Sequence, residues 1–213
     1  ELQEHRYKMR EQLRSASDTI DRGTLDMEVL RKELKTQLGD LRLQADQSWI
    51  TSPEASLTVD TAINLNGKTL SVAAQNQVTF SGSINGTGGI KLNSTGKLII
   101  DDATYSGATL VEKGKLEVTG TLSRSAVMVE KDAALGGTGY IGGHIVIANN
   151  ATLSPGSESA LGTLSCMGGL TLKGNIQVAV NPALSPNSDR INVSGPLEVQ
   201  PGSANIITIA NIG

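Results

Sequence analysis

Residues 86–120 read GTGGIKLNSTGKLIIDDATYSGATLVEKGKLEVTG, and apolar side chains alternate with polar ones along this stretch. The alternation falls in three short bursts, at Ile90/Leu92, Leu98/Ile100 and Leu116/Val118. Gly, Asn, Ser, Thr and Asp separate the bursts. A period of two residues is typical of a strand with one buried face, and the separating residues are typical of turns. The stretch therefore predicts short strands joined by tight turns.

No helical pattern lies between these strands, so only the next coil of the same chain can cover their apolar face. We therefore expect an all-β fold, a right-handed single-stranded parallel β-helix in which each coil stacks on the one before. The apolar pairs return after about 20 residues, within the range of solenoid repeats, so about seven coils fit. The ladders predicted to share one interior comprise Ile90, Leu92, Leu98, Ile100, Leu116, Val118, Val127, Val129, Ile145 and Ile147.

The short motifs of residues 86–120 also follow a definite order. GTGG comes first, then an apolar pair, GKLII, TYSGAT and GKLEVTG. This order and spacing closely resemble the passenger-associated repeat of bacterial autotransporters (type V secretion), which typically reads GSGGL, GTLTL, NTYSGGT and GTLxVNG. Here Ile90 stands for the usual Leu, Asp102-Ala103 stands in the usual Asn region, and Ala108 replaces the second Gly of the SGGT turn.

The second half of the chain carries different motifs, ALGGTGYIGG at residues 134–143, ATLSPG at residues 151–156 and NPALSPNSDRINVSG at residues 181–195. They resemble the end of autotransporter passengers, where GATLGGTGTIGG and ATLSPGxSxGTL precede a hairpin with an SDxLxVTG core. The resemblance covers about residues 62–199. It implies an autochaperone-like region of C-terminal coils that fold first and template the rest.

Composition supports a narrow aliphatic interior. Aromatic residues make up 2% of the chain and there are 24 Gly, whereas a globular enzyme of 213 residues usually buries more aromatic area. The net charge of −3 carries no electrostatic footprint for nucleic acid. The single cysteine, Cys166, excludes an internal disulfide and is predicted to be a small buried hydrophobic side chain. No apolar run approaches about 18 residues, and no signal peptide follows Glu1, so a targeting segment is expected outside this sequence.

Residues 1–48 differ from the rest, since they hold nine of the 18 Lys and Arg and ten of the 21 Asp and Glu. Their apolar residues follow a heptad that Arg6, Gly23 and Gln37 interrupt. This pattern predicts an α-helical segment, either a coiled coil or a helical hairpin with a new start near Gly23. The end of a neighbouring domain or an unrelated fused segment are further readings. The heptad positions are Leu2, Met9, Leu13, Ala16, Ile20, Met27, Leu30, Leu34 and Leu41.

The changes in composition suggest four parts: a charged helical segment at 1–48, a linker or cap at 49–56, a β-helix with the passenger-associated repeat at 57–134, and autochaperone-like coils at 135–213. Trp49 is suited to covering the open end of a solenoid, where the first coil would otherwise expose its apolar interior.

The sequence offers little that points to chemistry. His5 and His144 lack a second His, a Cys pair or a carboxylate cluster at ligand spacing, so no metal site is expected. Asp101 and Asp102 are adjacent, which on a strand would point them to opposite faces. The GGTG at Gly136 has no helix after it to hold a phosphate, and GSES at Gly156 is a turn rather than a nucleophile elbow. We therefore predict no catalytic, cofactor-binding or metal-binding residues, no cofactor and no enzyme activity.

The resemblance implies a non-catalytic stalk at the bacterial cell surface or outer membrane, or secreted, that supports adhesion, aggregation or virulence. Its implied partners are the C-terminal β-barrel translocator of the same polypeptide, expected outside this sequence, and a host surface or neighbouring cells; the solenoid is expected to be monomeric and to bind no nucleic acid. One alternative is a stalk that carries an upstream subtilisin-like protease or esterase. A second is a trimeric phage tailspike-like β-helix that binds polysaccharide.

Overall fold

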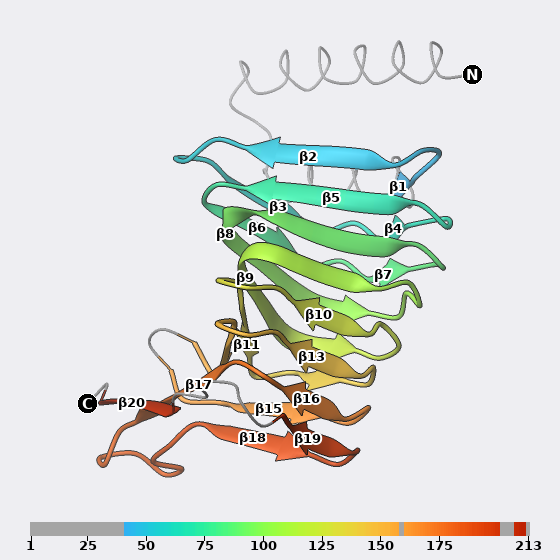
Figure 1. Cartoon of the computed structure of the whole chain (residues 1–213). Helices are drawn as coiled ribbons and strands as arrows, with labels where there is room; N and C mark the ends of the chain where they lie inside the picture. The colour runs from blue at the N-terminus through green and yellow to red at the C-terminus, as the bar shows by residue number, and fades with distance from the viewer. Residues whose placement is uncertain (1–40, 158–159, 201–206, 212–213) are drawn as a thin grey trace. The chain divides into compact units, whose positions relative to one another are not determined.

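The computed structural model describes residues 41–157, 160–200 and 207–211 (Figure 1). These residues belong to one compact unit that spans Asp40–Gly213. The described residues contain strands, turns and bends but no helix, and the strands pair in parallel. The predicted all-β parallel solenoid is therefore confirmed, with about seven turns. The right-handed sense of the winding stays a prediction, based on the strong preference of connections between parallel strands for a right-handed path.

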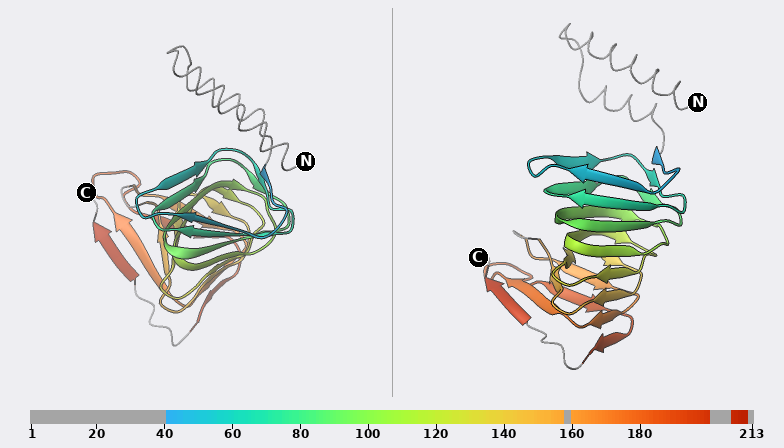
Figure 2. Two further views of the ribbon diagram at one scale, coloured as in Figure 1. Left: turned by 90° about the horizontal axis from the view of Figure 1, so that it is seen from above. Right: turned by 45° about the horizontal axis from the view of Figure 1, so that its top comes forward.

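The strands form one continuous 20-stranded sheet that is wound into three faces (Figures 1 and 2). Two long strands, β8 (Gly89–Ala103) and β9 (Thr109–Leu122), run through all three faces. Face 1 also contains β2 (Gln47–Thr51), β5 (Thr69–Ala74), β10 (Val127–Val129), β13 (Ile145–Ile147), β16 (Leu170–Leu172) and β19 (Leu197–Val199).

Face 2 contains β3 (Ser56–Val59), β6 (Gln77–Phe80), β11 (Ala134–Gly137), β14 (Thr152–Pro155), β17 (Asn175–Val180) and β20 (Ile207–Asn211). Face 3 contains β1 (Leu41–Arg42), β4 (Ile63–Asn64), β7 (Ile84–Asn85), β12 (Tyr140–Ile141), β15 (Thr163–Cys166) and β18 (Arg190–Val193). Each turn of the chain thus adds one strand to each face.

The interior consists of aliphatic ladders that run along the axis of the solenoid. On face 2 the ladder places Val78, Leu98, Leu116, Leu135 and Leu153 in register, one from each successive turn. All ten residues predicted for the interior are buried in one hydrophobic cluster, so that prediction is confirmed. Full burial of one such side chain contributes about 1.5–3 kcal/mol relative to exposure, which makes the ladders the main stabilising feature.

The TYSGAT motif places a polar network inside this aliphatic core. The ring of Tyr105 is fully buried, and its hydroxyl lies 2.6 Å from Thr109 Oγ1. Thr109 Oγ1 lies 2.7 Å from Ser125 Oγ, which donates to the Gly107 carbonyl at 2.7 Å. Each buried hydroxyl thereby has a partner, as burial of polar groups requires. Ala108 is exposed and does not adopt a positive φ, so the structure accommodates Ala in place of the usual Gly.

Residues 41–48 do not form the helix that the heptad predicts. Leu41 pairs with Ile63 through β1, Leu43 is buried, and β2 begins at Gln47. The helical prediction is therefore wrong for residues 41–48, because their backbone pairs with the next turn of the solenoid and Leu43 packs into its interior, whereas an isolated helix of this length is only marginally stable. The rest of the predicted helical segment, residues 1–40, lies outside the described residues. The four proposed domain boundaries stay predictions.

Trp49 occupies an inward position in the first described turn of face 1, where it pairs with Val72. Its ring is half-buried and meets Phe80 edge-on, with ring centroids 5.8 Å apart. Trp49 thus packs against the hydrophobic core, and its role as a cover of the open end stays a prediction.

Candidate functional site

The acidic pair lies at the corner between faces 2 and 3, where a register shift separates Ile100 from Asp102. Asp101 and Asp102 are both exposed, contrary to the opposite orientations expected on a regular strand. Asp101 accepts a long hydrogen bond of 3.4 Å from the Thr119 hydroxyl, and Asp102 accepts the backbone N–H of Thr121 at 3.1 Å. The two carboxylates therefore bind different groups of the next turn, and this arrangement is one of turn stabilisation rather than paired acid-base chemistry.

The other residues singled out from the sequence are also bound within the fold. The ring of His144 lies 3.2 Å from the Gly168 carbonyl through Nδ1 and 2.9 Å from Thr171 Oγ1 through Nε2. Cys166 is fully buried on face 3, in register with Ile141 and Val193, and burial raises the pKa of its thiol to about 11. His5 lies outside the described residues. No group of three or more His, Cys, Asp or Glu among residues 41–157, 160–200 and 207–211 could hold a metal ion.

A cleft of about 320 Å³ opens on face 2, where two neighbouring strands separate. β14 and β17 pair only at Thr152↔Asn175 and Leu153↔Ile176, so the rest of β17 pairs with β20 alone. Figure 2 shows β17 and β20 projecting away from the stacked turns. The cleft is lined by Lys115, Ala134, Thr152, Ser154, Pro155, Ser157, Gln177, Ala179, Asp189 and Ala210.

The separation of the strands depends on Asp189. The residue is 7% exposed, and its two carboxylate oxygens accept the backbone N–H groups of Gly162 at 2.8 Å and Ala179 at 2.7 Å. The backbone N–H of Asp189 in turn donates to the Ala179 carbonyl at 2.9 Å. Asp189 therefore takes the place of a neighbouring strand for this part of β17. Gly156, at φ +74°, packs against the same carboxylate, and a Cβ there would lie 2.5 Å from its Oδ1.

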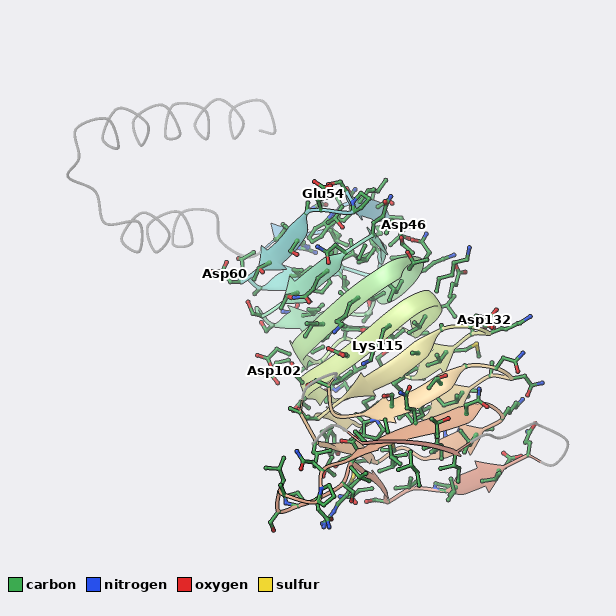
Figure 3. The ribbon with its side chains drawn as sticks, turned by 90° about the vertical axis from the view of Figure 1, so that its left-hand side faces the viewer. Asp46, Glu54, Asp60, Asp102, Lys115 and Asp132 are labelled. Carbon is green, nitrogen blue, oxygen red and sulfur yellow. The ribbon has the colours of Figure 1, made fainter. Side chains whose placement is uncertain are left out.

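Lys115, which lines the cleft, belongs to a charged cluster. Glu117, whose side chain is 6% exposed, has its Oε1 at 2.8 Å from Lys115 Nζ and at 3.3 Å from Lys97 Nζ. Figure 3 labels Lys115 on this side of the molecule. Lys115 extends over Gly136, where an added Cβ would lie 3.0 Å from the lysine Cε. The small residues Ala134 and Gly136 thus leave the space that the lysine stem and the cleft occupy.

The sequence predicted no site here, because the lining residues come from six separate stretches of chain. Apart from Lys115, Pro155 and Asp189, each of them is an ordinary Ser, Thr, Gln or Ala in a strand or turn. The available signal was indirect: Asp189 belongs to the quoted motif at residues 181–195, and Gly162 lies in the segment LGTL at residues 161–164, which matches the GTL that ends the family pattern ATLSPGxSxGTL.

Comparison with known proteins gives significant similarities to large surface and secreted proteins. The chain is 36% identical over 82 residues to the Adhesin BmaC autotransporter of Brucella suis biovar 1 (strain 1330), which covers 37% of this chain and 2% of that protein. It is 29% identical over 174 residues to the Toxin CdiA of Escherichia coli, which covers 76% of this chain and 5% of that protein. The chain is an autotransporter-like passenger β-helix.

A third relative of this passenger β-helix is the tRNA nuclease CdiA of Escherichia coli O6:K15:H31 (strain 536 / UPEC), 29% identical over 165 residues. That match covers 73% of this chain and 5% of the nuclease. No family model matches the chain, and no solved structure shows a significant match. The similarities place the passenger β-helix at the bacterial cell surface or outer membrane, or among secreted proteins. Within the described residues, no helix is long and apolar enough to cross a membrane.

Proposed function

We propose that this passenger β-helix is a non-catalytic stalk that supports adhesion, aggregation or virulence at the bacterial surface. The observation that carries the proposal is the continuity of the interior ladders from turn to turn. Aliphatic side chains occupy that interior, which leaves the outer faces and the corners for contact with other molecules. The similarity to an autotransporter adhesin supports the same role.

The proposed partners are a C-terminal translocator of the same polypeptide, a host surface and neighbouring cells. We propose further that residues 135–213 act as an autochaperone, so that the solenoid folds from its C-terminal coils during secretion across the outer membrane. The buried ladder positions Leu164, Leu170 and Leu172 support this proposal, because they offer the preceding turns a preformed edge.

The decisive experiment expresses the complete gene in a strain that lacks it, with and without residues 41–200. Surface display is measured by antibody labelling of intact cells at an epitope outside the deletion, and adhesion and aggregation by adherence to cultured cells and by sedimentation. We expect the deletion to abolish adhesion or aggregation. Normal adhesion and aggregation by cells that display the deleted form would overturn the proposal.

A second candidate is a stalk that carries a toxic or enzymatic domain elsewhere on a longer polypeptide. The CdiA relatives favour it, since their matches cover about three quarters of this chain and their names include toxin and tRNA nuclease. The chain covers 5% of those proteins, so the named activity is a property of the relatives. Growth inhibition of neighbouring cells by the strain that expresses the complete gene would support this candidate over adhesion alone.

A measurement of mass in solution separates both candidates from a tailspike-like β-helix. We expect sedimentation equilibrium of the 213-residue chain to give the mass of a monomer, 22.2 kDa. A trimer would support the tailspike alternative.

A further inference from the structure

The cleft between β14 and β17 is lined by both apolar and hydrogen-bonding side chains. Ala134, Pro155, Ala179 and Ala210 contribute the apolar surface. Thr152, Ser154 and Ser157 contribute hydroxyl groups, and Gln177 contributes an amide. Small-molecule sites in proteins commonly have this composition, a largely apolar surface with a few polar groups that orient the ligand.

The hydrogen-bonding side chains of the lining are available for a ligand. In the part of the chain that the structure describes, the side chains of Thr152, Ser154 and Gln177 form no hydrogen bond with another protein group. Hydroxyl and amide groups of this kind can each both donate and accept. They are held on β14 and β17, which are anchored to the solenoid by the pairs Thr152↔Asn175 and Leu153↔Ile176. The groups therefore converge on the cleft without a rearrangement of the backbone.

The charged residues of the cleft point to a neutral ligand. The Lys115 ammonium faces Glu117 at 2.8 Å, a carboxylate that it shares with Lys97, and together with Asp189 the two lysines and two carboxylates carry no net charge. Both oxygens of Asp189 bind backbone N–H groups. An ammonium group has three donors, so Lys115 can still donate to a neutral hydroxyl. A phosphate or a nucleotide would need several uncompensated donors, which this arrangement does not supply.

We propose that the cleft binds a single neutral sugar residue, either free or at the end of a glycan. A pyranose ring presents hydroxyl groups around its edge and C–H groups on its faces, which matches a lining of hydroxyl and amide groups beside apolar side chains. The volume of about 320 Å³ lies at the lower end of the range for small-molecule sites, which suits one ring rather than a chain of rings. The inference deepens the proposed surface role by naming a ligand class. It rests on that proposed function only in assuming that the protein meets the sugar at the bacterial surface.

The test is a titration of the isotopically labelled 213-residue chain with glucose, galactose and N-acetylglucosamine, followed through its backbone amide NMR signals. We expect at least one of the three to cause saturable shifts at residues 152–157 and 177–179, with a dissociation constant on the order of 1 mM. An oligosaccharide that ends in the same sugar distinguishes a free sugar from the end of a glycan. If the oligosaccharide binds as tightly as the free sugar or more tightly, the ligand is a glycan end, and if it binds more weakly, the ligand is the free sugar.

Two variants and a matched control locate the binding. Ser154→Leu fills the cleft, and Gln177→Ala removes the amide, so each should weaken binding by about tenfold or more. Thr79→Leu is the control. Thr79 lies in the same outward column of face 2 as Ser154, since Ile99, Glu117 and Gly136 follow it in register from turn to turn, but it lies several turns away from Ser154. The melting temperature of each variant verifies that it is folded.

Three results would overturn the inference. The first is no saturable binding of any of the three sugars by the unmodified chain. The second is equal binding by folded Ser154→Leu and Thr79→Leu. The third is binding of glucuronate but of none of the neutral sugars. None of these results bears on the deletion experiment with intact cells, so the sugar site can fail while the surface role stands.

Discussion

The side-chain carboxylate of Asp189 accepts a hydrogen bond from the backbone N–H of Gly162 at 2.8 Å, across 27 positions of the sequence. Its other oxygen accepts the N–H of Ala179 at 2.7 Å. This residue therefore joins two motifs that the sequence shows as separate, LGTL and SDRINVSG. The contact explains why an acidic residue belongs in this turn: a buried carboxylate compensates two backbone donors that have no strand partner.

Replacement of Asp189 by Ala should destabilise the C-terminal turns. Two buried N–H groups would lose a charged acceptor, which costs about 3 kcal/mol in the free energy of unfolding. Asp189→Asn should cost less, because its amide oxygen can still accept one of the two bonds. Urea unfolding followed by circular dichroism measures both. Asp132→Asn is the control, since Asp132 is an exposed turn residue with φ +65°, a conformation that Asn tolerates. Equal midpoints for Asp189→Ala and Asp132→Asn would contradict the role of Asp189.

The buried Tyr105 should make the fold sensitive to alkaline pH. Burial raises the pKa of Tyr105 from 10.0 to about 12, against the opposing effect of its hydrogen bonds to Thr109 and Ser125. The folded state then retains a proton that the unfolded state loses above pH 10. The stabilisation is complete below pH 10 and decreases as the pH rises to about 12, by about 1.4 kcal/mol for each pH unit.

The Tyr105→Phe variant isolates this contribution. Its unfolding free energy should fall less steeply than that of the unmodified chain between pH 10 and 12, although the variant is about 1 kcal/mol less stable at pH 7 through the lost hydrogen bond. Tyr140→Phe is the control, since Tyr140 is exposed. If the slopes of the unmodified chain and of Tyr105→Phe coincide, the phenol does not titrate within the fold.

The thiol of Cys166 should report the opening of the C-terminal turns. Burial keeps the side chain from solvent and raises the pKa of the thiol to about 11, so little thiolate forms at pH 8 and reagent cannot reach it. We expect a disulfide reagent to label the native protein slowly and the urea-unfolded protein completely. Ser71→Cys in a Cys166→Ala background places a thiol on the outer side of face 1 and should react promptly. Equally fast labelling of native Cys166 would show that β15 opens freely.

Folding should begin in the C-terminal coils. Leu172 is 5% exposed and lies between Ile147 and Val199 in the face 1 ladder. Leu172→Asp would bury an unpaired carboxylate at a cost of several kcal/mol and remove the edge on which the preceding turns stack. Val59→Asp, in the half-buried first turns, should fray only that end. Hydrogen exchange of both variants measures the extent of the loss. Global loss of protection in Val59→Asp, with protected N-terminal turns in Leu172→Asp, would reverse the proposed polarity.

Structure also changes the choice of residue for this experiment. The sequence ranks Val178 with Leu172, because both belong to dense apolar bursts. Val178 is only half-buried. β14 no longer pairs with β17 after Ile176, so at Val178 only β20 pairs with the strand. An aspartate at residue 178 could reach solvent, and Leu172 is therefore the sharper test.

The two-residue alternation by itself determined the stacked strands and the inward ladder, because the direction of a strand side chain depends only on its position relative to its neighbours. The order of the motifs determined the resemblance to autotransporter passengers. Only the tertiary structure decided the features that depend on contacts with residues about 20 or more positions away in the sequence. Leu41 fits a heptad and a strand equally well, and pairing with Ile63 makes it a strand. The bonds of Asp189, the Tyr105 network and the cleft beside Ser154 join different turns, and no local period encodes a contact between turns.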